Sequence, residues 1–372
     1  MSRHLSSLAH FLHARILLLL LAVYVLASVV PGPGLALRKI CIASGSMGTA
    51  LGPSLTLPAL LLAFLLFNAG LGARFSALRN IRQSVLLMGV GTLANLAAPL
   101  LAILALHFCL RFWHSPVEFQ NILTGMVLVA SMPIAGSSTA WAQNAKGDLT
   151  VSLGLVLLST ALSPVTTPLL LRAGSWMTAG DWSRRLHALS SQGTGGFLLA
   201  YVLMPAVAGI LTRLLLGESR MQRIQPTIKI VNTAVLVLLC YMNAAVSLPR
   251  IIARPDADFL ALVLLVTVFF CVVTFGAGWL LARALRLDPA RQAPLVFGLG
   301  MNNNGTGLVV AGAALPDYPL VLLPILLYNL VQHLAAGLAD RLLFLQADSR
   351  RPISGVPDLT PDRLRPGQSF NP

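Results

Sequence analysis

Apolar residues along this chain gather into ten runs of membrane-spanning length, and short segments between the runs hold most of the charges. A stretch of about 20 apolar residues crosses a bilayer as an α-helix, so the pattern predicts ten transmembrane helices. The runs cover residues 15–31, 53–72, 84–110, 118–144, 149–171, 196–216, 228–248, 259–284, 291–314 and 318–345. We expect residues 1–345 to form a single transmembrane domain, with the first run retained as a helix. Residues 346–372 are rich in Pro, Asp and Arg, and we expect a disordered cytoplasmic tail there.

The composition agrees with a membrane protein. Apolar residues make up 56% of the chain and charged residues 10%, whereas soluble domains carry roughly 25% charged residues. The net charge of +14 would suggest nucleic-acid binding in a soluble protein. Here the basic residues lie between the apolar runs, so we expect them to contact lipid headgroups, and we expect no nucleic-acid partner. The four cysteines have no CxxC spacing and are expected to be neither metal ligands nor disulfide-bonded.

Lys and Arg are distributed unequally between the two sides that ten helices would create. When both termini and every second connection are placed on one side, that side receives most of the 26 Lys and Arg residues. Positively charged connections are retained in the cytoplasm. The distribution therefore predicts an inner (plasma) membrane protein with both termini in the cytoplasm.

Five apolar runs, a polar stretch around residues 174–195 and five further runs suggest an internal repeat. An odd number of helices in each half places the halves in opposite orientations, as in many secondary transporters. The sequence therefore predicts two inverted five-helix repeats, over about residues 15–171 and 196–345.

The fourth and ninth runs are each interrupted by glycine and small polar residues, at corresponding positions of the two halves. The interruptions fall at residues 132–140 and 298–307. Gly and Ser also allow helices to pack closely, and that alternative stays open for Gly136 to Ser138. The run Asn302 to Asn304 is more polar than packing requires, and it is costly within a span unless it lines a cavity. The pattern predicts that helices 4 and 9 are broken and that their unwound backbone forms a binding site.

Several segments together resemble one transporter family. They are residues 133–148, the stretch Ser159 to Pro168, Asp288 to Gln292, Gly300 to Gly305, and His333. On these residues the chain, over about 53–345, resembles the bile acid:sodium symporter family. The resemblance implies an all-α polytopic fold of ten transmembrane helices, with a core domain, a panel domain and two crossed, broken helices.

The resemblance also implies binding residues. Five residues are expected to bind an ion, because they match ion ligands of the family or stand next to such a position in the second break. They are Ser138, Thr139, Ser152, Asn302 and Asn303. Of these, Ser138, Thr139, Ser152 and Asn303 are the candidates for contact with Na⁺. Substrate contacts are expected from Ser137, Asn304 and Thr306 nearer the cavity, and from His333 in its wall.

Three expected ligands are missing. Gly298 stands where the family has an acidic residue, Val156 stands where it has Thr, and Ala94 stands where it has Gln. Sodium needs only oxygen ligands, which hydroxyl groups, amides and backbone carbonyls can supply. Without the carboxylate, the charge of the ion would be balanced by the substrate, which favours an anion.

These observations predict a secondary active transporter that takes up a small organic anion by alternating access, coupled to sodium. A sodium-independent transporter on the same fold, either proton-coupled or a uniporter, stays open as the alternative. No cofactor other than sodium as coupling ion and no obligatory protein partner are expected. An enzyme is not expected, because the chain has no HExxH or Gly-x-Ser-x-Gly motif and no acidic residue in the interior of a span. A membrane receptor would not need paired breaks in opposed halves.

Overall fold

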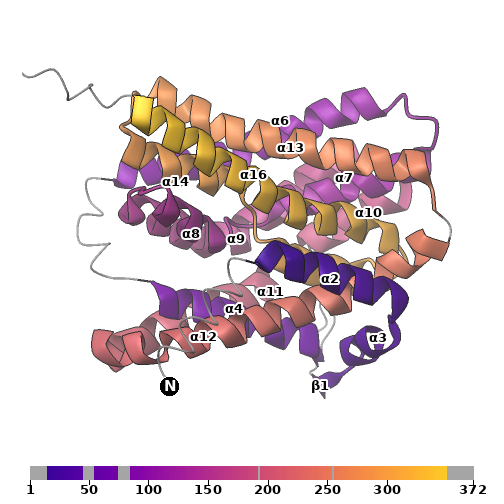
Figure 1. Ribbon diagram of the computed structural model, residues 1–372. Coiled ribbons are helices and arrows are strands. Elements are labelled where there is room, and N and C mark those ends of the chain that lie inside the picture. Colours follow the sequence, from indigo (N-terminus) through magenta and orange to yellow (C-terminus); the bar gives the residue numbers. More distant parts are fainter. Residues whose placement is uncertain (1–14, 45–53, 74–83, 192, 254, 350–372) are drawn as a thin grey trace, which may run out of the picture.

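The computed structural model describes residues 15–44, 54–73, 84–191, 193–253 and 255–349, and it is almost entirely helical there (Figure 1). The only strands in these ranges are β1 (Cys41–Ser44) and β2 (Ser54–Thr56), which pair antiparallel. The helices are α2 (Ile16–Val29), α3 (Gly32–Arg38), α4 (Leu57–Gly72), α6 (Val85–Leu110), α7 (Pro116–Ser131), α8 (Ser137–Asn144), α9 (Leu149–Met177), α10 (Gly180–Ser191), α11 (Thr194–Leu198), α12 (Met204–Ala253), α13 (Ala257–Ala284), α14 (Pro289–Gly300), α15 (Asn304–Ala314) and α16 (Leu322–Ser349). Short turns of π-helix (Leu199–Leu203) and 3₁₀-helix (Pro319–Val321) join α11 to α12 and precede α16.

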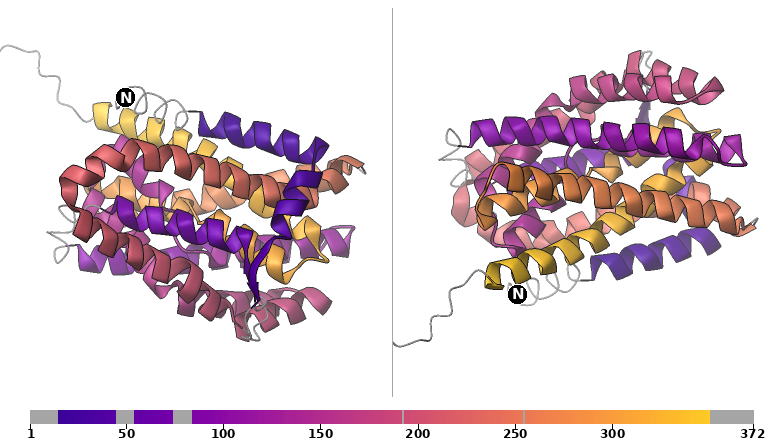
Figure 2. Two further views of the ribbon diagram at one scale, coloured as in Figure 1. Left: turned by 90° about the horizontal axis from the view of Figure 1, so that it is seen from below. Right: turned by 90° about the horizontal axis from the view of Figure 1, so that it is seen from above.

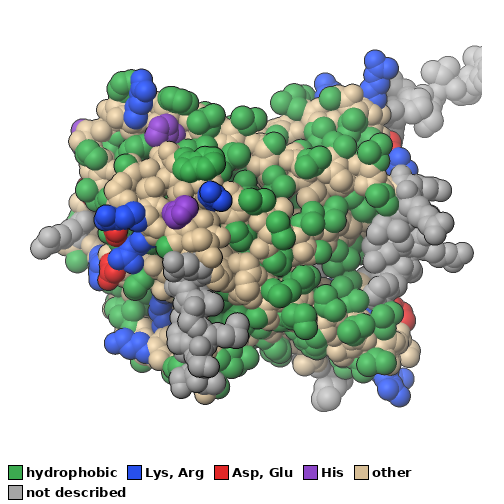
Figure 3. Space-filling model, turned by 180° about the vertical axis from the view of Figure 1, so that it is seen from behind, with side chains coloured by type: hydrophobic (Ala, Val, Ile, Leu, Met, Phe, Trp, Pro, Cys, Tyr) green, Lys and Arg blue, Asp and Glu red, His purple; other side chains and the backbone are tan. Residues whose placement is uncertain are grey.

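Several helices are long and apolar enough to cross a bilayer. Within the described ranges there are five such segments, namely α6, α9, Thr194–Ala253, α13 and Pro319–Leu343. The pair α2 and α3, bent by 97°, gives a sixth when it is counted as one span. Figure 3 shows charged side chains toward the two ends of one face, with hydrophobic side chains spread over the broad middle. The protein is therefore a polytopic, multi-pass membrane protein.

The connections differ from the expected pattern in some places. The runs 196–216 and 228–248 form two helical arms that meet at a kink at Gly217, where φ is +73°, and the range of α12 spans this kink. Glycine adopts this backbone conformation without the steric cost that a side chain would bring. The polar stretch around 174–195 forms α10. The last helix continues to Ser349, so residues 346–349 of the tail predicted over 346–372 are helical, and the rest of that tail lies outside the described residues.

The helices form two layers (Figure 1). The lower layer in this view contains α2, α3, α4, α11 and α12, and the views in Figure 2 place α4 and α12 on the face opposite α6 and α13. Helices α4 and α12 cross at glycines. A Cβ atom on Gly70 would overlap the backbone oxygen of Ala206, and one on Gly209 would overlap that of Phe67. Small residues at these positions let the two backbones approach closely, as is common between membrane helices.

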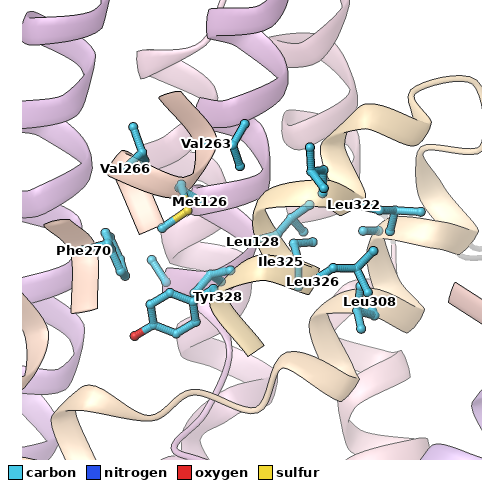
Figure 4. Packing of buried hydrophobic residues seen from close by; sticks show 14 of the residues in the cluster. Met126, Leu128, Val263, Val266, Phe270, Leu308, Leu322, Ile325, Leu326 and Tyr328 are labelled. Carbon is cyan, nitrogen blue, oxygen red and sulfur yellow. The ribbon is translucent and has the colours of Figure 1, made fainter. Parts of the chain in front are cut away.

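The upper layer is built around an apolar cluster, which Figure 4 shows from close by. Met126 on α7, Phe270 on α13, Leu308 on α15 and Tyr328 on α16 are all fully buried in it. The rings of Phe270 and Tyr328 meet edge to face, with their centroids 5.5 Å apart. Close packing between four helices fixes α15 and α16 relative to α7. It therefore also positions the end of α7 and the start of α15, where the helical structure is interrupted.

Candidate binding site where two broken helices cross

The interruptions in the fourth and ninth runs are breaks in helical structure that lie against each other. The chain leaves helical conformation between α7 and α8, and again between α14 and α15. Ile134 of the first break and Asn302 of the second form an antiparallel backbone bridge. The N–H of Ala135 donates to the carbonyl oxygen of Met301 at 2.9 Å, and that of Asn303 donates to Pro133 at 2.9 Å. Each break thus supplies the backbone partners that the other needs inside a membrane.

The second break is held by its own Asn302 side chain and by two side chains of α16. The Asn302 amide donates from Nδ2 to the carbonyl oxygen of Val129 on α7 at 2.9 Å. Its backbone N–H donates to Oε1 of Gln332 at 3.2 Å. The hydroxyl of Tyr328 donates to the carbonyl oxygen of Gly300 at 3.0 Å, at the last residue of α14. These bonds occupy backbone groups that the end of a helix leaves without intrahelical partners.

Hydroxyl groups of α9 hold the first break. The N–H of Ile134 donates to Oγ of Ser159 at 3.2 Å, and Thr167 donates from Oγ1 to the carbonyl oxygen of Ser131 at 2.6 Å. Both residues lie in or near the Ser- and Thr-rich stretch that carries the family resemblance. Their supporting role, and that of Gln332, was not predicted, because sequence spacing does not show which backbone group a hydroxyl or amide reaches.

The residues predicted to bind an ion lie in two groups. Oγ of Ser152 donates to Oγ1 of Thr139 at 3.1 Å, which brings α9 and α8 together at the first break. Ser138 is 1% exposed and its hydroxyl has no hydrogen-bond partner. Asn303, at the second break, accepts from the N–H of Thr306 at 3.3 Å and caps α15. Among the described residues, no hydrogen bond joins Asn303 to the Thr139–Ser152 pair.

The residues predicted to contact substrate lie mainly at the start of α15. Asn304 and Thr306 are 2% and 0% exposed, and neither their amide nor their hydroxyl has a hydrogen-bond partner. Ser137 is the first residue of α8 and His333 lies on α16, and both are half-buried. A buried polar group without a partner costs free energy, so Asn304 and Thr306 are the groups here best suited to receive a ligand.

The other layer of helices covers this crossing. A Cβ atom on Gly305 would lie 3.8 Å from a methyl group of Leu239 on α12. A Cβ atom on Gly136 would lie 3.9 Å from the Cβ of Ala69 on α4. The crossing therefore lies at the seam between the two layers.

The positions of the missing family ligands are surrounded by apolar side chains. A Cβ atom on Gly298 would lie 3.3 Å from a methyl group of Leu155 and 3.8 Å from one of Ile134. Ala94 and Val156 pack against the cluster of buried apolar residues that contains Ile134 and Leu155. A second cation could not be held by these side chains, because none of them offers an oxygen ligand. The described residues contain no group of three or more His, Cys, Asp or Glu side chains that could hold a metal ion.

Comparison with known proteins identifies the type of molecule. A model of the sodium bile acid symporter family matches residues 59–254, a range that includes the first break. In Bacillus subtilis (strain 168), the uncharacterized protein YbaS is 26% identical over 290 residues, which cover 76% of this chain and 86% of YbaS. The uncharacterized sodium-dependent transporter YocS of the same organism is 24% identical over 282 residues, covering 74% of this chain and 79% of YocS.

Proposed function

The chain belongs to the sodium bile acid symporter family, and from this premise we propose that it takes up a small organic anion by secondary active transport coupled to sodium. It is a multi-pass membrane transporter and not an enzyme. The proposal extends to the substrate class, the coupling ion and the alternating-access mechanism, each argued below from the crossing of the two breaks.

We propose ten spans arranged as two inverted repeats, with both termini in the cytoplasm of the cell and the protein in its plasma membrane. The turn at Gly217 divides the segment Thr194–Ala253 into two arms, and each broken helix pair would count as one span. The antiparallel pairing of Ile134 with Asn302 supports the repeat, because two segments related by an inverted repeat run in opposite directions where they cross.

One observation carries the transport proposal. Four residues at the breaks, Ser138, Asn302, Asn304 and Thr306, each hold a buried polar atom without a hydrogen-bond partner. Single atoms of this kind also occur elsewhere in the helices, for example on Thr92 and Asn95 of α6, but four residues gather at the breaks, and a group of buried polar atoms without partners suits a ligand. Because the crossing also lies at the seam between the layers, a ligand bound there could reach either side when the layers shift.

The helix ends at the crossing suit both an anion and a cation. Helices α8 and α15 begin there with the positive ends of their dipoles, which suit an anionic group, whereas α7 and α14 end there with carbonyl oxygens, which suit a cation. The candidate residues at the crossing include no Asp or Glu, so a bound cation would need its charge balanced by the substrate. Hydroxyl oxygens of Ser138, Thr139 and Ser152, with the amide oxygen of Asn303, are the oxygen ligands proposed for Na⁺.

A second candidate is a sodium-independent transporter on the same fold. The apolar surroundings of Gly298, with Leu155 and Ile134 beside it, favour this alternative because the position of the family's acidic ligand offers no side-chain oxygen to a cation. The relative YocS is described as a sodium-dependent transporter, which supports sodium coupling.

Thermal unfolding of the purified protein separates the two candidates. Unfolding temperatures are compared in sodium, potassium and choline chloride at equal ionic strength. A ligand at a hundredfold excess over its Kd stabilises the folded state by about 2.7 kcal/mol, so sodium coupling predicts a sodium-specific rise that Asn303→Ala removes. Equal unfolding temperatures in the three salts would contradict sodium coupling and favour the alternative.

A further inference from the structure

Arg38 places a positive charge at the seam between the two layers, away from the crossing. It is the last residue of α3, and its Nη1 donates to Oδ1 of Asn243 on α12 at 2.9 Å. Asn243 is fully buried, and its own Nδ2 donates to the carbonyl oxygen of Leu239 at 2.8 Å. The acceptor that faces Arg38 is therefore held in one orientation.

The guanidinium also lies directly against the other layer. A Cβ atom on Gly312 of α15 would overlap the guanidinium of Arg38, so in this position the guanidinium lies directly against the α15 backbone. On the α12 side, Gly34 packs against Ala245, and the hydroxyl of Tyr241 donates to the carbonyl oxygen of Val30. Helix α3 is thus fixed on α12, while the charged end of Arg38 touches α15.

No carboxylate forms an ion pair with Arg38 among the residues that the structure describes. Its partner is a neutral amide. Arg213, the other arginine drawn deeply inward, has Glu218 at 2.6 Å. A guanidinium taken partly out of water loses hydration that an amide replaces only in part, whereas a carboxylate or sulfonate can accept two parallel N–H bonds from it. The carbonyl end of α15 offers further negative character nearby.

We propose that Arg38 is a specificity-determining residue that binds the anionic group of the transported substrate. When the layers separate at this seam, the guanidinium exchanges the Asn243 amide for a carboxylate or sulfonate of the substrate. When they close, Arg38 returns to Asn243 and Gly312. This inference rests on the proposed transport of an organic anion and names the residue that selects for its charge.

Lys39 provides the matched control. It follows Arg38 directly, carries the same charge, and is exposed. Replacing Lys39 by Ala therefore removes one positive charge from the same segment without touching the seam. Arg38→Lys keeps the charge but not the planar fork that binds carboxylates with two hydrogen bonds.

The test uses the full-length protein in proteoliposomes, with radiolabelled cholate as the carboxylate probe and methyl cholate as its uncharged counterpart. Wild-type protein should take up cholate and should be inhibited more strongly by unlabelled cholate than by methyl cholate. Arg38→Ala should raise the KM for cholate about tenfold or more, with little change in kcat, and should abolish the preference for cholate over its ester. Arg38→Lys should restore part of the preference, and Lys39→Ala should leave it unchanged.

Other results would overturn the assignment in distinguishable ways. Cholate uptake by Arg38→Ala with an unaltered KM and an unaltered preference would refute the role of Arg38 and leave the transport proposal standing. An equal loss of affinity for cholate and methyl cholate, together with a lowered unfolding temperature, would show that Arg38 has a structural role only. Absence of both cholate uptake and cholate binding in the wild type would count against the proposed function and against Arg38 with it.

Discussion

Ile134 and Asn302 face each other as an antiparallel backbone pair, at the point where two helices from opposite halves of the chain are both interrupted. Two backbone hydrogen bonds of 2.9 Å flank this pair. The pairing fixes the two breaks relative to each other, and with them the starts of α8 and α15. We propose that access to the breaks changes at the seam with α4 and α12.

The pairing predicts different roles for two neighbouring asparagines. Asn302→Ala removes the donor to Val129, whose carbonyl oxygen then keeps only the bond from the N–H of Met132 at 3.2 Å, so we expect a loss of about 0.5–1.5 kcal/mol in the free energy of unfolding. Asn304→Ala removes an amide that has no partner and should leave stability nearly unchanged while it abolishes substrate binding. Unfolding curves and uptake assays on the two variants measure this. Equal destabilisation by both would contradict the distinction.

Two glycines of α14 provide a second matched comparison. A Cβ atom at Gly300 would overlap the ring of Phe275, whereas one at Gly298 would lie 3.3 Å from a methyl group of Leu155, which can move. Overpacking of a close-packed interior costs about 1–3 kcal/mol. Gly300→Ala should therefore lower the unfolding temperature clearly, and Gly298→Ala should lower it little. The prediction fails if the two variants unfold at the same temperature.

Arg213 should stabilise the turn between the two arms of the long helical segment. It is 6% exposed, and it donates to the carbonyl oxygen of Leu71 at 2.8 Å and to Glu218 at 2.6 Å. Arg213→Ala leaves a buried carbonyl oxygen without this donor, for an expected loss of about 1–3 kcal/mol. Glu218 is largely exposed, so Glu218→Gln should cost less than about 1 kcal/mol. A larger effect of the Glu218 substitution, measured by thermal unfolding, would contradict this account.

Asp181 predicts a pH dependence outside the membrane-spanning helices. Hydrogen bonds from Tyr318, and then from Arg185, lower the pKa of Asp181 to about 2. A carboxyl group whose pKa is depressed in the folded state stabilises that state above its unfolded value of 3.8, and this stabilisation is lost as the pH falls toward 2. The difference in unfolding temperature between wild type and Asp181→Asn should therefore be largest above pH 5 and should shrink below pH 4. Tyr318→Phe should raise the pKa of Asp181, and a difference that does not vary with pH would refute the assignment.

Sequence reasoning located the breaks because their residues conflict with a membrane span. Asn302 to Asn304 and the segment around Pro133 are costly in an apolar helix, so a pattern of apolar runs exposes them. The family resemblance is confirmed by the match over residues 59–254. The ion ligands, the substrate contacts and the ten-helix inverted repeat stay predictions.

What the sequence did not show depends on contacts between distant segments. The pairing of Ile134 with Asn302 joins residues far apart in the chain, and periodicity carries no information about such a pair. Gln332 stands beside the predicted His333, yet its bond to the backbone of Asn302 follows only from the rotation of α16. Arg38 was counted as one of the basic residues between spans. Only its contacts with Asn243 and Gly312 distinguish it from a residue at the lipid headgroups.

The most direct test of the central claim is uptake of a radiolabelled organic anion into proteoliposomes under an inward sodium gradient. Cholate serves as the anion, and wild type is compared with Asn304→Ala, since Asn304 has a buried amide without a partner at the crossing. The account predicts concentrative uptake by the wild type that falls when potassium replaces sodium, and loss of uptake in Asn304→Ala at an unchanged unfolding temperature. Uptake by Asn304→Ala at the wild-type rate would contradict the claim that the crossing of the two broken helices is the transport site.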